Sequence, residues 1–347
     1  FKQKTAYEIR LSLVGSEMCI RDRFAGDENA PKDEESYFIW KDIFEKKNIS
    51  GERIHYMGAK SNWWSAGDNG PCGPDTEMFY DVTGVLDKGL NKEEYLRADQ
   101  EQKVVEIWNN VFMEYEKKDG KVVGRLQNKN VDTGAGLERL TMVLQGKDNI
   151  FDTDLFLPIM AVTKPMTYDL FKQRILTDHI RTAVFMITDG VIPSNTDRGY
   201  VLRRLIRRAV FVTKDKQINY DEVSALVDTV ILVYQEIYES LAQKRFVIKK
   251  VIEEEVSKFT KTLESGLKEF EKGEDPFVLF TTYGFPFELT KELSRERGRE
   301  INEKDFWKKF KEHKDLSRTS SVGMFKGGLA NQSEKTVKLH TAHHLLL

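Results

Sequence analysis

From Val131 to Arg139 the chain reads Val-Asp-Thr-Gly-Ala-Gly-Leu-Glu-Arg, and this stretch joins a predicted strand to a predicted helix. Gly134 and Gly136 lack a Cβ, so the backbone there can come close to a ligand. The start of the following helix carries a partial positive charge that favours phosphate, and the Arg139 guanidinium can reach the same ligand. The stretch therefore predicts an ATP site. A plain structural turn is the alternative, because the Gly-x-Gly spacing alone is weakly specific.

Composition indicates a folded protein of more than one domain. The 347 residues suffice for two or three domains, and 40% hydrophobic with 32% charged residues excludes a disordered tail. No apolar run approaches the ~20 residues of a membrane span. A formal net charge of −2 gives no overall signature of nucleic-acid binding, so such binding must come from a local patch. Cys19 and Cys72 are the only cysteines, and we expect a cytoplasmic location.

The chain changes character along its length, and we predict four segments. Residues 24–165 carry short β-prone runs and predict a mixed α/β domain, whereas residues 166–322 predict a helical domain. Residues 1–23 match nothing downstream in pattern, and residues 323–347 open a further domain. The helical prediction rests on apolar residues at helical spacing: Leu202, Leu205, Ile206, Ala209 and Val210.

Longer blocks in a fixed order make the glycine pattern specific. They are Asn62 to Asp81 (with Gly-Pro-Cys-Gly-Pro-Asp-Thr-Glu), Glu106 to Met113, the 131–139 stretch, and Asp178 to Val210. Together they resemble the alanyl-tRNA synthetases, a family of class II synthetases, across residues 24–347. The resemblance implies an α+β fold: part of the class II antiparallel-sheet core, with 131–139 as its third signature motif, followed by a helical tRNA-recognition domain.

The resemblance also implies a reaction and the residues that serve it. The carboxylate of L-alanine attacks the α-phosphate of ATP, with Mg²⁺, and the alanyl group then passes to tRNA(Ala). Such chemistry needs alignment and charge stabilisation more than a nucleophilic side chain.

By the resemblance, Asp132 matches the carboxylate that holds the alanine ammonium group. Trp108 matches the wall of the side-chain pocket, and Arg139 matches an ATP contact. The positions expected beside them are Asn109 and Val111 for alanine, Gly134 for alanine and ATP, and Gly136 for ATP. From pattern alone, a core position is the favoured reading of Trp108, and a turn or capping residue is an equal alternative for Asp132.

A basic segment predicts RNA binding. Its members are Arg198, Arg203, Arg204, Arg207 and Arg208. Arginines on both sides of an apolar stripe could bind the phosphate backbone of a tRNA acceptor stem. The alternative is a helix face that is simply exposed to solvent. The resemblance marks Asn195 as a reader of the G·U wobble pair of tRNA(Ala), and an N-cap or turn residue is the alternative. Thr281 stands where the family commonly has Asp, which weakens this transfer of roles.

Two histidines match the start of the family's editing domain. His340 and His344 share one helix face at a spacing that suits Zn²⁺. We expect zinc only in a longer parent protein, because the ion needs further ligands. Cys72 is assigned no metal, since Asp75 stands where many relatives have a second cysteine.

The start of the chain is expected to be extraneous. Residues 1–23 resemble translated adapter sequence, and the first two class II motifs are missing upstream of Phe24. We therefore expect the ligase activity to belong to the parent enzyme and the chain alone to be inactive. A non-catalytic tRNA-binding relative and a hydrolase of mischarged tRNA stay as alternatives. The sequence disfavours a kinase or P-loop ATPase, because no Gly-x4-Gly-Lys-Ser/Thr run occurs.

Overall fold

The computed structural model describes residues 19–49, 51–84, 90–216 and 220–324. The chain divides into two compact units, Phe1–Ala161 and Val162–Leu347. The division falls close to the boundary expected after residue 165.

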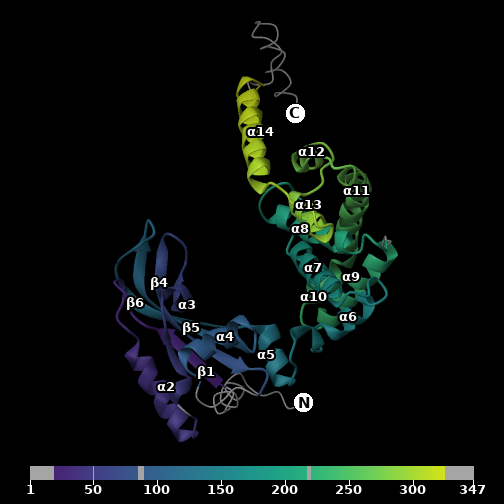
Figure 1. Ribbon diagram of the computed structural model, residues 1–347. Coiled ribbons are helices and arrows are strands. Elements are labelled where there is room, and N and C mark those ends of the chain that lie inside the picture. Colours follow the sequence, from purple (N-terminus) through teal and green to yellow (C-terminus); the bar gives the residue numbers. More distant parts are fainter. Residues whose placement is uncertain (1–18, 50, 85–89, 217–219, 325–347) are drawn as a thin grey trace, which may run out of the picture. The chain divides into compact units, whose positions relative to one another are not determined.

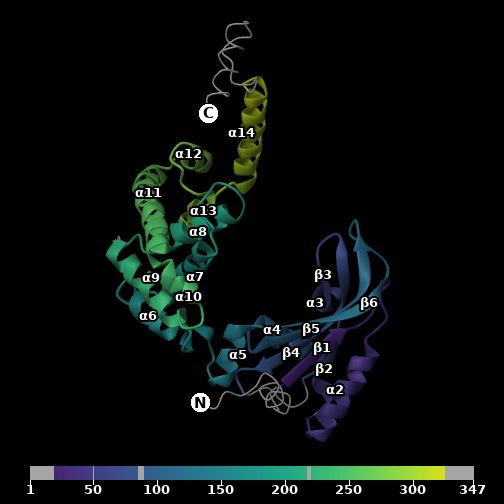
Figure 2. The same ribbon diagram turned by 180° about the vertical axis from the view of Figure 1, so that it is seen from behind.

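The first unit is built on one mixed sheet (Figures 1 and 2). Its strands follow the order β2-β1-β4-β5-β6, with β3 paired to β4. Among the described strands, β1 and β2 run parallel and the other pairs are antiparallel. The strands are β1 (Cys19–Phe24), β2 (Ile54–Met57), β3 (Trp63–Ser65), β4 (Gly70–Asp81), β5 (Val104–Lys118) and β6 (Lys121–Ala135). A mostly antiparallel sheet with helices confirms the predicted α+β class.

Helices cover the sheet on both faces. They are α2 (Glu34–Lys46), α3 (Ala59–Asn62), α4 (Lys92–Gln100) and α5 (Leu137–Leu144), with the short 3-10 helices η1 (Gly51–Arg53) and η2 (Ile150–Asp152). On one face Trp40 and Phe44 of α2 pack with Met78 of β4. On the other face Tyr95 of α4 packs with Phe79. Successive strand residues point to opposite faces, so Met78 and Phe79 serve two separate cores.

The sheet begins earlier than the predicted domain start. Cys19–Phe24 forms β1, which pairs with both β2 and β4, and all six of its residues are buried. The prediction that the domain starts at residue 24 is therefore corrected: residues 19–23 belong to the sheet. Polar side chains explain the difference, because Arg21, Asp22 and Arg23 interrupt the apolar pattern by which a buried strand is recognised.

The second unit is helical, as predicted. α6 (Leu157–Thr163) leads into it, and its helices are α7 (Leu170–Thr188), α8 (Asp197–Val212), α9 (Tyr220–Tyr234), α10 (Glu239–Gln243), α11 (Arg245–Glu271), α12 (Pro276–Thr281), α13 (Phe287–Glu296) and α14 (Glu303–Met324). The apolar stripe of α8 lies inside: Leu202, Ile206, Ala209 and Val210 are buried, and Leu205 is half-buried. This stripe packs α8 against α7 and α11.

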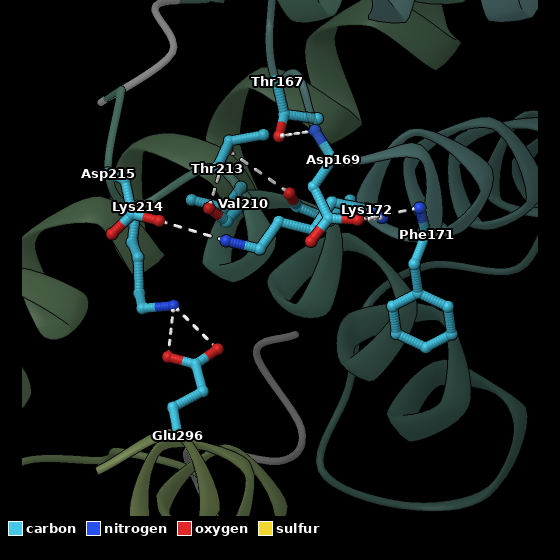
Figure 3. Close-up of polar contacts among 10 residues, drawn as sticks. Thr167, Asp169, Phe171, Lys172, Val210, Thr213, Lys214, Asp215 and Glu296 are labelled. Carbon is cyan, nitrogen blue, oxygen red and sulfur yellow. Dashed lines mark hydrogen bonds and ion pairs between the residues drawn. The ribbon is translucent and has the colours of Figure 1, made fainter.

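Ion pairs fasten the far end of α8 to its neighbours (Figure 3). The Lys172 Nζ of α7 lies 3.0 Å from the Asp215 Oδ2. The Lys214 Nζ lies 2.9 Å from the Glu296 Oε2 of α13, and Lys214 itself is almost fully covered. Asp169 caps α7, because its Oδ1 accepts a hydrogen bond from the Phe171 backbone N–H at 2.8 Å. α8 therefore ends at a fixed position between α7 and α13.

Across the described ranges, no helix combines the length and the apolar character that crossing a bilayer requires.

Candidate functional site

The predicted strand-to-helix junction is present. β6 ends at Ala135, Gly136 is the N-cap residue, and α5 begins at Leu137. Arg139 therefore lies on the first turn of α5, as expected. β5 lies beside β6 and carries Trp108, Asn109 and Val111.

The register of β5 and β6 divides the predicted residues between two faces. Val111 is the partner of Asp132, and Asn109 is the partner of Gly134. Cross-strand partners share a face of the sheet, so these four residues lie together. Trp108 pairs with Ala135, one position out of phase with them, and lies on the opposite face. The expectation that Trp108 walls a pocket beside Asp132 is therefore corrected.

Trp108 instead stabilises the strand-to-helix junction from the opposite face of the sheet. Its indole Nε1–H donates to the Thr133 Oγ1 at 2.6 Å, and its ring packs against the core between the sheet and α2. Thr133 follows Asp132 directly, and its backbone N–H donates to the Asp132 Oδ1 at 2.9 Å. Trp108 thus fixes the strand that carries Asp132 without facing the same side.

The two glycines of the junction have different roles. Gly134 does not have a positive φ, and a Cβ at this position would meet no atom within 4 Å. Neither backbone conformation nor packing within the protein requires a glycine there. Gly134 lies within β6 rather than in a turn, and the open space beside it leaves room for close approach of a ligand.

Gly136 makes room for Arg139. A Cβ on Gly136 would lie 2.7 Å from the Arg139 Nε. The guanidinium folds over the junction, and its Nη1 donates to the Glu106 Oε2 at 2.9 Å. The arginine is therefore held at the start of α5 by an acidic neighbour.

Carboxyl groups that the sequence reading did not assign lie on the face of Asp132. In β4, Asp75 is the partner of Val111, and Glu77 is the partner of Asn109. The Asn109 Nδ2 donates to the Glu77 Oε1 at 2.9 Å, and the buried Asn62 Nδ2 donates to the Asp75 Oδ1 at 2.9 Å. The sequence signal was available, because Asp75 and Glu77 alternate within the Gly-Pro-rich block that carries part of the family resemblance.

Burial and mutual repulsion shift these acids toward their neutral forms. Desolvation, followed by repulsion from Asp22 and Glu106, raises the pKa of Glu77 to about 9. Desolvation also raises the pKa of Asp75 to about 7, although the hydrogen bond from Asn62 opposes the shift. A cluster of this kind gains from a nearby cation, and Arg139 partly lowers the pKa of Glu77. Asp132, by contrast, is exposed on the edge strand.

The basic segment of α8 divides into two sets. Arg203 and Arg207 point inward, where both Nε atoms lie near the Glu255 Oε1 of α11, at 3.3 and 2.7 Å. Arg204 and Arg208 face α13, 3.9 and 3.5 Å from the carboxylates of Glu288 and Glu292. All four of these arginines line the groove between α8 and α13, but Arg203 and Arg207 are paired with the buried Glu255, whereas Arg204 and Arg208 have partners on α13.

That groove is lined mainly by basic side chains. Its volume is about 490 Å³. Its charged lining residues are Arg203, Arg204, Arg207, Arg208, Lys291 and Arg295, with Glu288 and Glu292. Arg198 is exposed on the first turn of α8, one turn before this groove.

Asn195 lies exposed in the loop before α8. The N-cap of α8 is Thr196, so the capping role considered for Asn195 is excluded. Thr281, where the family resemblance led us to expect Asp, donates its hydroxyl to the Phe277 carbonyl within α12 at 2.8 Å.

The metal predictions are not tested by the described residues. His340 and His344 lie outside them. Within the described part of the chain, no group of three or more His, Cys, Asp or Glu side chains could hold a metal ion. Cys72 is a buried free thiol in an apolar cluster, and burial raises its pKa.

A mostly antiparallel sheet with a strand-to-helix junction, followed by a helical unit, is the architecture expected of a class II synthetase core and its helical domain. The chain belongs to the class II tRNA synthetase family (A), whose sequence profile matches residues 21–346. The most similar relatives include alanine–tRNA ligases. That of Borreliella afzelii is 41% identical over 345 residues, and that of Treponema denticola is 41% identical over 348 residues. Each match covers 93% of this chain and 57% of the relative.

A more distant relative gives the same assignment. The alanine–tRNA ligase of Myxococcus xanthus is 37% identical over 328 residues, which are 86% of this chain and 36% of that protein. The chain thus spans little more than half the length of its nearer curated relatives.

Proposed function

We propose that this chain is part of an alanine–tRNA ligase, which joins L-alanine to tRNA(Ala) at the expense of ATP. Membership of the class II family and the names of its relatives support the reaction class. The single observation that carries the proposal is the shared face of Asn109, Val111, Asp132 and Gly134.

This face suits a small amino acid. The exposed Asp132 carboxylate is the anion available for the alanine ammonium group, and a charge-assisted hydrogen bond there is strong. Val111, its partner across the strands, is the apolar neighbour for a methyl group. At Gly134 no Cβ obstructs the substrate. A pocket that encloses only a methyl group separates alanine from glycine or serine weakly, so correction of errors is expected of the whole protein.

Adenylate formation needs phosphate contacts rather than a side-chain nucleophile. The alanine carboxylate attacks the α-phosphate of ATP, and the bond to the leaving pyrophosphate breaks. The start of α5 favours the phosphates through its free N–H groups. When ATP arrives, Arg139 can exchange Glu106 for a phosphate, because its guanidinium is half exposed. Bound Mg²⁺ would neutralise phosphate charge, and Glu77 and Glu106 are the carboxyls of the site that fit such a use.

The second step, transfer of the alanyl group, requires binding of the acceptor end of tRNA(Ala). Arg204 and Arg208, with Lys291 and Arg295, form the cationic groove suited to a phosphate backbone. Asn195 is the exposed amide beside it, able to meet a base edge in the shallow RNA minor groove.

The test is binding of L-alanine to the chain by calorimetry, together with alanine-dependent exchange of pyrophosphate into ATP. Asp132→Asn keeps the shape and removes the charge, so alanine binding is expected to fall by at least about tenfold. Asn130→Asp, on the same strand, is the matched control and is expected to leave binding unchanged. Equal binding of alanine by the wild type and Asp132→Asn would overturn the assignment of this pocket.

A further inference from the structure

Glu255 is a buried carboxylate that the proposed reaction does not use. It lies on α11 and is only 3% exposed. Both of its cationic partners come from α8: the Arg207 Nε at 2.7 Å and the Arg203 Nε at 3.3 Å. The Arg207 Nε donates a hydrogen bond to the Glu255 Oε1, whereas the Arg203 Nε makes an ion pair with it but no hydrogen bond. A buried charge is tolerated only when it is paired, so Glu255 holds both arginines next to it.

Arg203 extends this unit to the loop before α8. Its Nη1 donates to the Asn195 Oδ1, and its Nη2 lies 3.5 Å from the Pro193 carbonyl. Arg207 touches the ring of Phe259 instead, with the guanidinium carbon 5.1 Å from the ring centre. Of the two arginines that hold Glu255, Arg203 is therefore the one that reaches Asn195.

The loop itself is shaped to lie close to α8. A Cβ on Gly199 would lie 2.9 Å from the Ser194 Cβ. The Ser194 N–H donates to the Gly199 carbonyl at 3.1 Å, and the Ser194 hydroxyl donates to the Thr196 carbonyl at 2.7 Å. The backbone on both sides of Asn195 is thus held, and Arg203 fixes the side chain.

The bond from Arg203 also settles which way the amide points. A guanidinium only donates hydrogen bonds, so the atom that faces it must be the Asn195 oxygen. The Nδ2 group is then the free end of an exposed side chain, and it offers two donors to a partner.

We propose that Glu255 is a positioning residue for RNA recognition: through Arg203 it holds Asn195 with its NH₂ group outward, toward a hydrogen-bond acceptor in the RNA minor groove. This inference rests on the proposed function, since it assumes that Asn195 meets a base pair. The acceptors available in a minor groove are pyrimidine O2 and purine N3. The wobble displacement of a G·U pair moves the uracil O2, so a fixed donor can separate G·U from G·C.

The experiment measures affinity of the full chain for two RNA hairpins that differ in one stem pair, G·U or G·C. The ratio of the two affinities reports recognition, and it is insensitive to general loss of RNA binding. We expect Glu255→Gln and Arg203→Met to reduce this ratio by about tenfold, the effect of one lost hydrogen bond to a base. Asn195→Asp should reduce it similarly, and adding Glu255→Gln to Asn195→Asp should reduce it no further.

Matched variants separate positioning from stability. Arg207→Met loses its own ion pair and hydrogen bond to Glu255 but not the contact with Asn195, so the G·U to G·C affinity ratio should stay unchanged even if the melting temperature falls. Glu254→Gln changes the exposed neighbour on α11, which is paired with Lys258, and should change neither quantity. A ratio that falls equally in Arg207→Met and Arg203→Met would overturn the proposal.

A second readout does not depend on RNA recognition. The side-chain NH₂ resonances of Asn195, assigned by their loss in Asn195→Asp, should shift in Arg203→Met and Glu255→Gln but not in Glu254→Gln. If the wild type does not separate G·U from G·C while these shifts occur, the proposed tRNA recognition fails and the positioning holds. If no shift occurs, the positioning fails.

Discussion

Glu77 couples the candidate site to pH through a single side chain. Its carboxyl is half-buried beside Asp75, Asp22 and Glu106, and burial with this repulsion raises its pKa to about 9 from 4.5. Because the folded pKa is the higher one, the folded state holds a proton that the unfolded state has released at neutral pH. The stability that depends on this proton is complete below about pH 4.5 and is lost as the pH rises through 9.

Glu77→Gln is therefore expected to flatten the pH dependence of unfolding. Glutamine resembles the protonated acid but cannot ionise, so the variant should lose less melting temperature than the wild type between pH 5 and pH 9. Thermal unfolding by circular dichroism at several pH values measures this. Glu116→Gln, on the neighbouring strand with its side chain paired to Lys118 at the surface, is the control and should behave as the wild type does. A wild-type slope in Glu77→Gln would contradict the shifted pKa.

At the scale of elements, α8 is an amphipathic helix whose arginines serve two purposes. The pairs Arg204–Glu288, Arg208–Glu292 and Lys214–Glu296 advance together along the chain, so this face of α8 lies parallel to α13. The exposed Arg204 can leave its distant partner for a phosphate, whereas Arg207 is committed to the buried Glu255.

This division predicts different effects of two substitutions. Arg204→Ala with Arg208→Ala should weaken RNA binding about three- to tenfold at low salt and reduce the slope of log affinity against log salt by up to about 2, because each phosphate contact contributes about one unit. Arg207→Met should mainly lower the melting temperature, since it leaves a buried carboxylate with one partner fewer. Affinity titrations at three salt concentrations test both. An unchanged slope in the double variant would exclude the groove as the phosphate site.

Gly266 of α11 packs closely against the ring of Phe285. A Cβ there would lie 2.7 Å from the Phe285 Cγ. Ala is normally the better helix former by about 1 kcal/mol, but here the added methyl group must displace a buried ring. Gly266→Ala should therefore destabilise the helical unit by about 1–3 kcal/mol, as overpacking does. Urea unfolding measures the change, with Ser265→Ala at the exposed neighbouring position as the control.

Helices and strands were predicted from the sequence more accurately than the face of the sheet on which each side chain lies. Regular apolar spacing identified α8, and the glycine pair identified the junction between β6 and α5. The position of Trp108 was not predictable, because the face of a strand residue depends on the register with its partner strand, which no local pattern encodes. The burial of Arg21 and Arg23 was missed for a related reason: polar side chains in a central strand follow from their neighbours in space. Asp75 and Glu77 lay within a recognised block, but their mutual repulsion appears only when β4 and β5 are paired.

For the whole molecule, the two units provide separate reporters of stability. Each has its own buried core: β-sheet with α2 and α4 in the first, and α7, α8 and α11 in the second. Both Glu77 and its acidic neighbours belong to the first unit, while Gly266 and Phe285 belong to the second. Substitutions at these positions should therefore act on different parts of an unfolding curve.

We expect hydrogen exchange to resolve this independence. Gly266→Ala should lower the protection of amides in α7, α8 and α11 and leave β4 and β5 unchanged, because its clash is confined to the helical core. Raising the pH should accelerate exchange in β4 and β5 beyond the intrinsic base-catalysed increase, and Glu77→Gln should remove that excess. Exchange followed by mass spectrometry at matched intrinsic rates supplies the measurement. If Gly266→Ala reduced protection equally in both units, they would unfold as one cooperative body, and the pH dependence of Glu77 would then extend to the groove between α8 and α13.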